Sequence, residues 1–250
     1  MKKLLTLAGV VLAFGMASVS HAATVVGTEL ALLVDMSGSI SSTEFNLQKQ
    51  GYANAFNDSA IQNAIIAQGG VAVTFVYWDD HQYQSVNWTL INSVSSAQAF
   101  ANAILAASRP GSNGSTAPGS AINFITPQFA SNTYTGTNKI IDVSGDGVQN
   151  AGADTLTARN NALAAGVNQI NGLPIGGDSS VISFYQTKIK GGANSFVLPA
   201  ASFADFDSAV RIKIFSELTG ANPTPLPSAA VMGSALMGGL AFLRKRLKKA

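Results

Sequence analysis

The sequence has 250 residues, of which 47% are hydrophobic and 24 are glycine, enough for one domain of roughly 200 residues with a buried core. It has no cysteine, which excludes disulfides and thiolate metal sites. Seven of the 15 basic residues lie at the two ends of the chain. The body of the chain between them has eight basic and 13 acidic residues, so its formal net charge is about −5. An acidic body without a Lys/Arg cluster argues against nucleic-acid binding.

Residues 1–22 have the three parts of a secretory signal peptide. Two lysines form the charged start, 4–16 form the apolar middle, and 20–22 are a small-x-small cleavage site. A short membrane anchor is the alternative, but the apolar segment is short for a membrane span. We therefore expect an exported protein whose mature chain begins at Ala23 or Thr24.

The body alternates strand and helix patterns. An apolar run from residue 29 ends abruptly at Asp35, which is typical of a strand buried on both faces. Further strands are expected over 70–78, 82–91, 139–144, 167–173 and 195–198, and helices over 41–57, 59–68, 95–108, 118–125, 154–165, 180–188 and 204–218. The alternation predicts an α/β, Rossmann-like fold: a doubly wound, mainly parallel sheet with one antiparallel hairpin strand and helices on both faces.

Several helices carry local signals. Ser41 and Glu44 have the spacing of a capping box. Asn150 is expected to help cap the helix that begins near residue 154. The side chains expected to face inward from the helices over 41–57 and 95–108 are Phe45, Tyr52, Phe56, Phe100, Ile104 and Leu105.

The turn after the first strand carries candidate metal ligands. Asp35, Ser37 and Ser39 place one carboxylate and two hydroxyls at alternate positions. In open α/β sheets, ligands bind beyond the carboxyl ends of the strands. Hard oxygen donors suit Mg²⁺, Mn²⁺ or Ca²⁺. A Ser/Gly-rich turn that caps the next helix is the alternative interpretation of this segment alone.

The Asp-x-Ser-x-Ser segment resembles the metal-ion-dependent adhesion site (MIDAS) of von Willebrand factor type A (VWA) domains. Two later segments resemble the same family. Thr116 lies in Gly-x-Thr-x-x-Gly-x-Ala over 114–121, and Asp146 follows a strand within Ser-Gly-Asp-Gly over 144–147. Gly145 departs from the pattern, since many members have Thr there, and we expect this glycine to loosen the surroundings of the site.

The resemblance implies a role for each matched residue. Ser37 and Ser39 would bind the ion directly, and Thr116, Asp35 and Asp146 directly or through water. It also implies an open coordination position that accepts a carboxylate of a partner. The wider segments over 29–218 resemble an uncharacterised subfamily of exported bacterial type A-like proteins.

Other carboxylates have simpler interpretations. Asp79, Asp80 and His81 at a hairpin tip invite a second metal site, or a Ser-His-Asp triad, but loop tips commonly carry solvated carboxylates. Asp142 lies two residues from Ser144 on the same strand face. We expect it to be a buried, hydrogen-bonded carboxylate and not a sixth ligand.

The chain changes character at residue 220. A Pro-rich linker over 220–227 is followed by a tail over 228–250 that is apolar and then basic. This order is similar to PEP-CTERM sorting signals in a variant with a Pro-Leu-Pro core, although Pro-Glu-Pro itself is absent. The resemblance implies a Gram-negative bacterium, cleavage by an exosortase, and delivery to the outer surface or extracellular matrix. A plain C-terminal membrane anchor is the alternative.

These patterns favour a non-enzymatic, cation-dependent adhesion domain over 24–219. It would use Mg²⁺ or Mn²⁺, with Ca²⁺ possible, to recognise an acidic group on a protein or polysaccharide. One alternative is an envelope or biofilm-matrix component in which the ion only stabilises the fold. Another is a metal-assisted hydrolase, but no evident general base or catalytic residue accompanies the motif.

Overall fold

The computed structural model describes residues 22–111 and 114–223. The predicted signal peptide up to residue 21, and the predicted linker and tail from residue 224, lie outside these residues. No helix in the described part of the chain is both long and apolar enough to cross a membrane.

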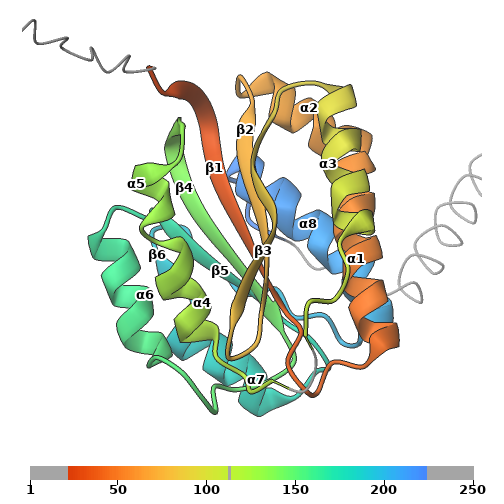
Figure 1. The fold of residues 1–250 in the computed structure, drawn as a ribbon, viewed down its shortest axis with the longest axis vertical. Helices are drawn as coiled ribbons and strands as arrows, with labels where there is room; N and C mark the ends of the chain where they lie inside the picture. The colour runs from red at the N-terminus through yellow and green to blue at the C-terminus, as the bar shows by residue number, and fades with distance from the viewer. Residues whose placement is uncertain (1–21, 112–113, 224–250) are drawn as a thin grey trace, which may run out of the picture.

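A central sheet organises the domain (Figure 1). In the described residues it has six strands in the order β3-β2-β1-β4-β5-β6. Their bounds are β1 (Thr24–Asp35), β2 (Val71–Trp78), β3 (Gln82–Ile91), β4 (Tyr134–Gly145), β5 (Gln169–Pro174) and β6 (Gly191–Gly192). Strands β2, β1, β4 and β5 run parallel, and β3 pairs antiparallel with β2. The predicted α/β fold with a mainly parallel sheet and an antiparallel hairpin strand is confirmed.

Helices cover both faces of the sheet (Figure 1). One face carries α1 (Ser42–Asn57), α2 (Ser59–Ala67), α3 (Val94–Ala106) and α8 (Phe206–Thr219). The other carries α4 (Pro118–Ile125), α5 (Gln128–Ser131), α6 (Thr155–Ala164), α7 (Ser179–Phe184) and the π-helix η1 (Tyr185–Ile189). A short 3-10 helix, η2 (Phe203–Asp205), precedes α8. Two apolar cores result, one on each side of the sheet.

Strand β1 supplies side chains to both cores because successive residues of a strand point to opposite faces. Leu30, Leu32 and Val34 pack with one core, and Ala31 and Leu33 pack with the other. All five side chains are fully buried. The continuous apolar run therefore reflects a strand that is covered on both faces, as predicted.

The start of α1 shows the predicted capping box. The Ser41 hydroxyl accepts from the Glu44 N–H at 3.3 Å, and the Glu44 carboxylate accepts from the Ser41 N–H at 2.8 Å. The predicted inward side chains of α1 are buried, as are Phe100 and Ile104 of α3. The prediction for Leu105 is wrong, because it is 38% exposed. It lies one residue beyond Ile104, about 100° further around the helix.

The predicted strand over 195–198 is also wrong. Strand β6 lies earlier, at Gly191–Gly192, and pairs antiparallel with β5. The segment after it forms only isolated bridges beside β5, at Val197 and Ala200. Leu198 and Ala200 donate to the carbonyls of Gly172 and Pro174. The ladder bond between these two would need an N–H at residue 174, and Pro174 on β5 has none, so the ladder is interrupted there.

A buried ion cluster joins α8 to the sheet. Lys213 Nζ lies 2.6 Å from a carboxylate oxygen of Asp142 on β4 and 2.6 Å from one of Glu217. Asn171 on β5 donates to the same Glu217 oxygen at 3.0 Å. Burial raises the pKa of Asp142 against the opposing effect of Lys213, and burial raises the pKa of Glu217 to about 7. The prediction that Asp142 is buried is confirmed, and its partner is the Lys213 ammonium in an ion pair and not the hydrogen bonds that were expected.

Replacing Lys213 with methionine should destabilise the protein strongly. The change leaves Asp142 and Glu217 buried without their cation, a loss that typically costs about 3–5 kcal/mol. Urea unfolding measures it, and Lys188→Met, at an exposed position in η1, serves as the matched control. A loss below about 1 kcal/mol, the size expected for an exposed pair, would contradict this account.

Candidate metal centre

The parallel pairing of β1 with β4 brings two of the predicted segments together. Val34 pairs with Ser144, so the two strands end at the same level of the sheet. The chain continues from them into Asp35 and Asp146 at the lower end of the domain in Figure 1. The third segment joins them because the Gly38 N–H donates to the Gly114 carbonyl at 2.8 Å.

All five predicted ligand residues lie in one cluster. The Ser39 hydroxyl donates to the Asp146 carboxylate at 2.6 Å. The hydroxyl oxygens of Ser37 and Ser39 are 3.3 Å apart, and the Thr116 hydroxyl lies 3.5 Å from that of Ser37. Asp35 Oδ1 accepts from the Ser37 N–H at 2.7 Å. The cluster thus combines two carboxylates with three hydroxyls.

Asp35 is fully buried, and only one of its carboxylate oxygens has a partner. Oδ2 accepts no hydrogen bond from the described residues. Burial raises the pKa of this carboxyl to about 7, against the bonds from Ser37. A buried ionised carboxylate is costly unless a cation or further donors balance it. The unpartnered oxygen and the all-oxygen donor set therefore fit a hard divalent cation.

Asp146 is half-buried at the surface of the cluster. Burial raises the pKa of its carboxyl, the bond from Ser39 opposes this rise, and the nearby charge of Glu44 adds to it. A divalent ion would offset both the burial and the repulsion between carboxylates, since the opposite charge favours the ionised form.

Three further side chains hold the loops of the cluster, and the sequence patterns did not identify them. Asn150 accepts from the Thr116 N–H at 2.8 Å. The expectation that it caps α6 is wrong, because Asp154 is the N-cap residue. Gln48 donates to the Asp35 carbonyl at 3.1 Å, and Arg109 donates to the Met36 carbonyl at 2.8 Å. These bonds form between distant segments, so no local signal reveals them.

Gly145 leaves space that Tyr185 occupies. A Cβ at residue 145 would lie 2.5 Å from Asp35 Oδ2 and 2.9 Å from the Tyr185 hydroxyl oxygen. Tyr185 belongs to η1 and is fully buried, and its hydroxyl has no partner in the described residues. A tyrosine from another element thus packs close to this position, and the loosening expected at Gly145 remains a prediction.

The Asp79–His81 hairpin tip lies beside the loop that carries Thr116, because the Asp79 and Asp80 carboxylates pack against Gly114. Asp79 is buried and accepts from the His81 N–H at 2.7 Å, as in a turn. The His81 side chain is 70% exposed, and its Nδ1 lies 3.3 Å from Asp80. The ligand atoms of Asp79, Asp80 and His81 lie within 4.8 Å of one another, so the second metal site remains a prediction beside the loop-tip interpretation, which the burial of Asp79 does not favour.

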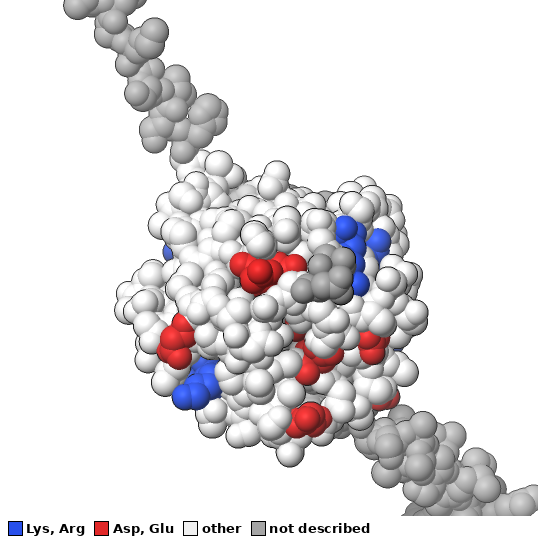
Figure 2. Space-filling view, turned by 60° about the horizontal axis from the view of Figure 1, so that its bottom comes forward, with Lys and Arg blue, Asp and Glu red and all other residues white. Residues whose placement is uncertain are grey.

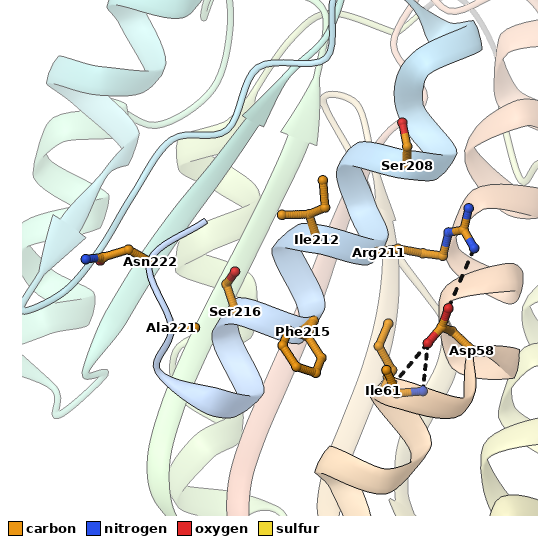
Figure 3. A pocket seen from close by; sticks show the side chains of 10 residues that line it. Asp58, Ile61, Ser208, Arg211, Ile212, Phe215, Ser216, Ala221 and Asn222 are labelled. Atoms are coloured by element: carbon orange, nitrogen blue, oxygen red, sulfur yellow. Dashed lines mark hydrogen bonds and ion pairs between the residues drawn. The ribbon is translucent and has the colours of Figure 1, made fainter. Parts of the chain in front are cut away.

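A cavity of about 490 Å³ lies between α2 and α8, away from the cluster (Figure 3). Its lining includes Asp58, which pairs with Arg211 at 3.6 Å, and the half-exposed Phe215. None of the five predicted ligand residues lines it. The chemistry of the chain therefore concentrates at the carboxyl ends of the strands and not in this cavity.

The chain belongs to the family described as "Protein of unknown function (DUF1194)", whose model matches residues 25–222. The comparison with curated proteins found no match.

Solved structures with a similar fold include two extracellular proteins and one type A domain. Proximal thread matrix protein 1 from the mussel byssus is 16% identical, with a TM-score of 0.57 over 77% of this chain and 48% of its own. The pilus adhesin SpaC from Lactobacillus rhamnosus GG is 17% identical, with a TM-score of 0.57 over 77% and 31%. A von Willebrand factor type A protein from Catenulispora acidiphila is 13% identical, with a TM-score of 0.55 over 77% and 43%.

The fold is therefore VWA-like, as the sequence motifs predicted. The chain spans less than half the length of each of these three proteins. The likeness shows the architecture alone, and the ligand roles of the five residues remain predictions.

Replacing Asp35 with asparagine should stabilise the protein in a chelator and abolish its stabilisation by Mg²⁺. At a pH above the raised pKa of about 7, the wild-type carboxylate is ionised, and one of its two oxygens has no hydrogen-bond partner. The neutral amide should raise the free energy of unfolding by roughly 1–3 kcal/mol. Denaturant unfolding with and without Mg²⁺ measures both effects.

The matched control for this experiment is Asp154→Asn, an exposed helix cap on α6 that asparagine can replace. It should change neither the free energy of unfolding in a chelator nor the stabilisation by Mg²⁺. Mg²⁺ that stabilises the Asp35→Asn variant as much as the wild type would show that the ion does not bind at this cluster.

Proposed function

From the VWA-like fold and the geometry of the cluster, we propose that the protein is a divalent-cation-dependent binding protein of the adhesion type. It recognises an acidic group on a protein or polysaccharide through the ion. The observation that carries the proposal is the clustering of five oxygen-bearing side chains, among which the buried Asp35 has one carboxylate oxygen without a partner.

The five clustered residues have distinct roles in this proposal. The hydroxyls of Ser37, Ser39 and Thr116 supply neutral ligands, and Asp35 and Asp146 supply charge directly or through water. An ion with few charged direct ligands keeps its affinity for a further carboxylate, which the partner provides. The hydrogen bond from Ser39 to Asp146 links the two strand ends and keeps these donors close together.

We favour Mg²⁺ or Mn²⁺ as the ion, with Ca²⁺ as a further candidate, because every donor is a hard oxygen. A structure of the similar mussel protein is described as having a "zinc occupied MIDAS motif". This supports a divalent ion in the corresponding motif of a similar fold.

We place the protein outside the cytoplasm, at the surface or in the extracellular matrix of a Gram-negative bacterium. The support is the signal-peptide pattern and the similar folds of a byssus matrix protein and a pilus adhesin. The PEP-CTERM-like tail adds contact with a membrane and an exosortase to this proposal.

A purely structural ion in a matrix component is the second candidate function. The buried carboxylate of Asp35 favours it, because an ion there would also stabilise the fold. Hydrolysis is disfavoured because His81, the histidine of the described residues, belongs to the hairpin tip and not to the five-residue cluster.

Calorimetric titration of Mg²⁺ and Mn²⁺ into the wild type and Asp146→Ala tests the proposal. The wild type should bind one ion saturably, and the variant should lose this binding while it keeps its circular dichroism spectrum. Asp154→Asn should bind the ion like the wild type. Unfolding of Asp146→Ala would favour the structural role, and equal ion binding in all three proteins would contradict the proposed site.

A further inference from the structure

A groove of about 570 Å³ begins at Asp146 and continues along the surface beside the cluster. Glu44 and Leu47 of α1 line one part of it, and Asp178 and Phe203 line another. Ten residues form the lining, of which three are carboxylates and none is Lys or Arg. A partner whose carboxylate reaches an ion at Asp146 would therefore extend into an acidic groove.

The carboxylates of the groove carry uncompensated charge. Glu44 and Asp178 form no ion pair with any Lys or Arg that the structure describes. Asp178 accepts from the N–H and the hydroxyl of Ser180 at 2.7 Å each, which holds its pKa below the usual value and keeps it ionised. Figure 2 shows this end of the molecule, where acidic side chains gather and basic ones lie to either side.

A charge balance indicates what the groove would accept. A divalent ion balances the charges of Asp35 and Asp146, so the charges of Glu44 and Asp178 remain in the groove lining. Arg109 contacts the Met36 and Ser37 carbonyls but does not line the groove. A partner carboxylate on the ion adds one more negative charge. A partner that is anionic throughout would then be repelled, whereas a cationic group beside its carboxylate would be attracted.

The apolar part of the groove fits a long basic side chain. Leu47 is 40% exposed and Phe203 is half-buried, and both line the groove. Arg and Lys bury their aliphatic stems against such surfaces while the charged head remains near water and carboxylates. A partner with this chemistry would gain both apolar contact and charge pairing.

We propose that the partner is a protein segment in which an acidic side chain, directed at the ion, stands next to an Arg or Lys that lies in this groove. The inference rests on the proposed metal-dependent binding and adds a partner class to it. It separates such a segment from a uniformly anionic polysaccharide, which has the carboxylate without the neighbouring cation.

The test uses the full chain in saturating Mg²⁺ and fluorescent synthetic peptides that differ only beside one central Asp. The neighbouring residue is Arg, Ala or Glu, and polygalacturonate serves as the anionic polysaccharide. The Arg peptide should bind tightest, with each charge pair contributing about two- to five-fold. Added salt should reduce the preference, because partly exposed charges are screened.

Two variants locate the preference. Glu44→Gln keeps the capping hydrogen bond and Asp178→Asn keeps a helix cap, so each removes mainly a charge. Each should lower the advantage of the Arg peptide over the Ala peptide by about two- to five-fold. Asp154→Asn, the same kind of cap outside the groove, should leave that advantage unchanged.

The inference would be overturned if the Glu peptide or polygalacturonate bound as tightly as the Arg peptide, or more tightly. It would also be overturned if the preference for the Arg peptide survived in a protein that carries both Glu44→Gln and Asp178→Asn. If calorimetry shows ion binding but no peptide binds, the inference also fails and the ion site stands. Absence of ion binding by the wild type would instead overturn the proposed function itself.

Discussion

The parallel pairing of β1 with β4 is the constraint on which the candidate site depends. The register that aligns Val34 with Ser144 makes both strands end at one level. The Asp-x-Ser-x-Ser turn and the turn that carries Asp146 then face each other, and the bond from Ser39 to Asp146 closes the gap. Because side chains alternate along a strand, a shift of one residue in this register would turn the polar and apolar positions to the wrong faces.

The same two strands connect the site to the helices through buried polar contacts. Tyr52 of α1 donates to the Ser144 hydroxyl at 3.1 Å, just before the turn with Asp146. Two residues earlier on β4, Asp142 pairs with Lys213 of α8. Polar groups in a low-dielectric interior restrict packing because each needs its partner. The positions of α1 and α8 are thereby tied to the strand that supports the site.

Local patterns allowed most elements of the fold and the Asp-x-Ser-x-Ser turn to be predicted, whereas Thr116 and Asp146 were identified through the family resemblance. The apolar run of β1, the capping box of α1 and the β2–β3 hairpin each depend on neighbouring residues, so the sequence contains their signals. The clustering of Thr116 with the other ligands was expected from the family resemblance, and spacing alone does not reveal it. The metal-binding roles themselves stay predictions.

The features that were missed depend on contacts between distant segments. Tyr185 fills the space at Gly145 from a π-helix 40 residues later in the chain. The Asn150 side chain accepts a hydrogen bond from the Thr116 N–H and does not cap the helix that follows it. The segment expected as a strand at 195–198 forms no continuous ladder with β5, because Pro174 has no N–H to donate and Phe196 donates its N–H to the Asn171 side chain at 3.0 Å. Sequence periodicity carries no information about such tertiary partners.

The most direct test of the account is to locate the ion by anomalous diffraction from crystals of the protein grown with Mn²⁺. The account predicts one strong anomalous peak among the hydroxyls of Ser37, Ser39 and Thr116, beside Asp35 and Asp146. A peak only at the Asp79–His81 hairpin tip, or no peak in crystals that contain saturating Mn²⁺, would contradict it.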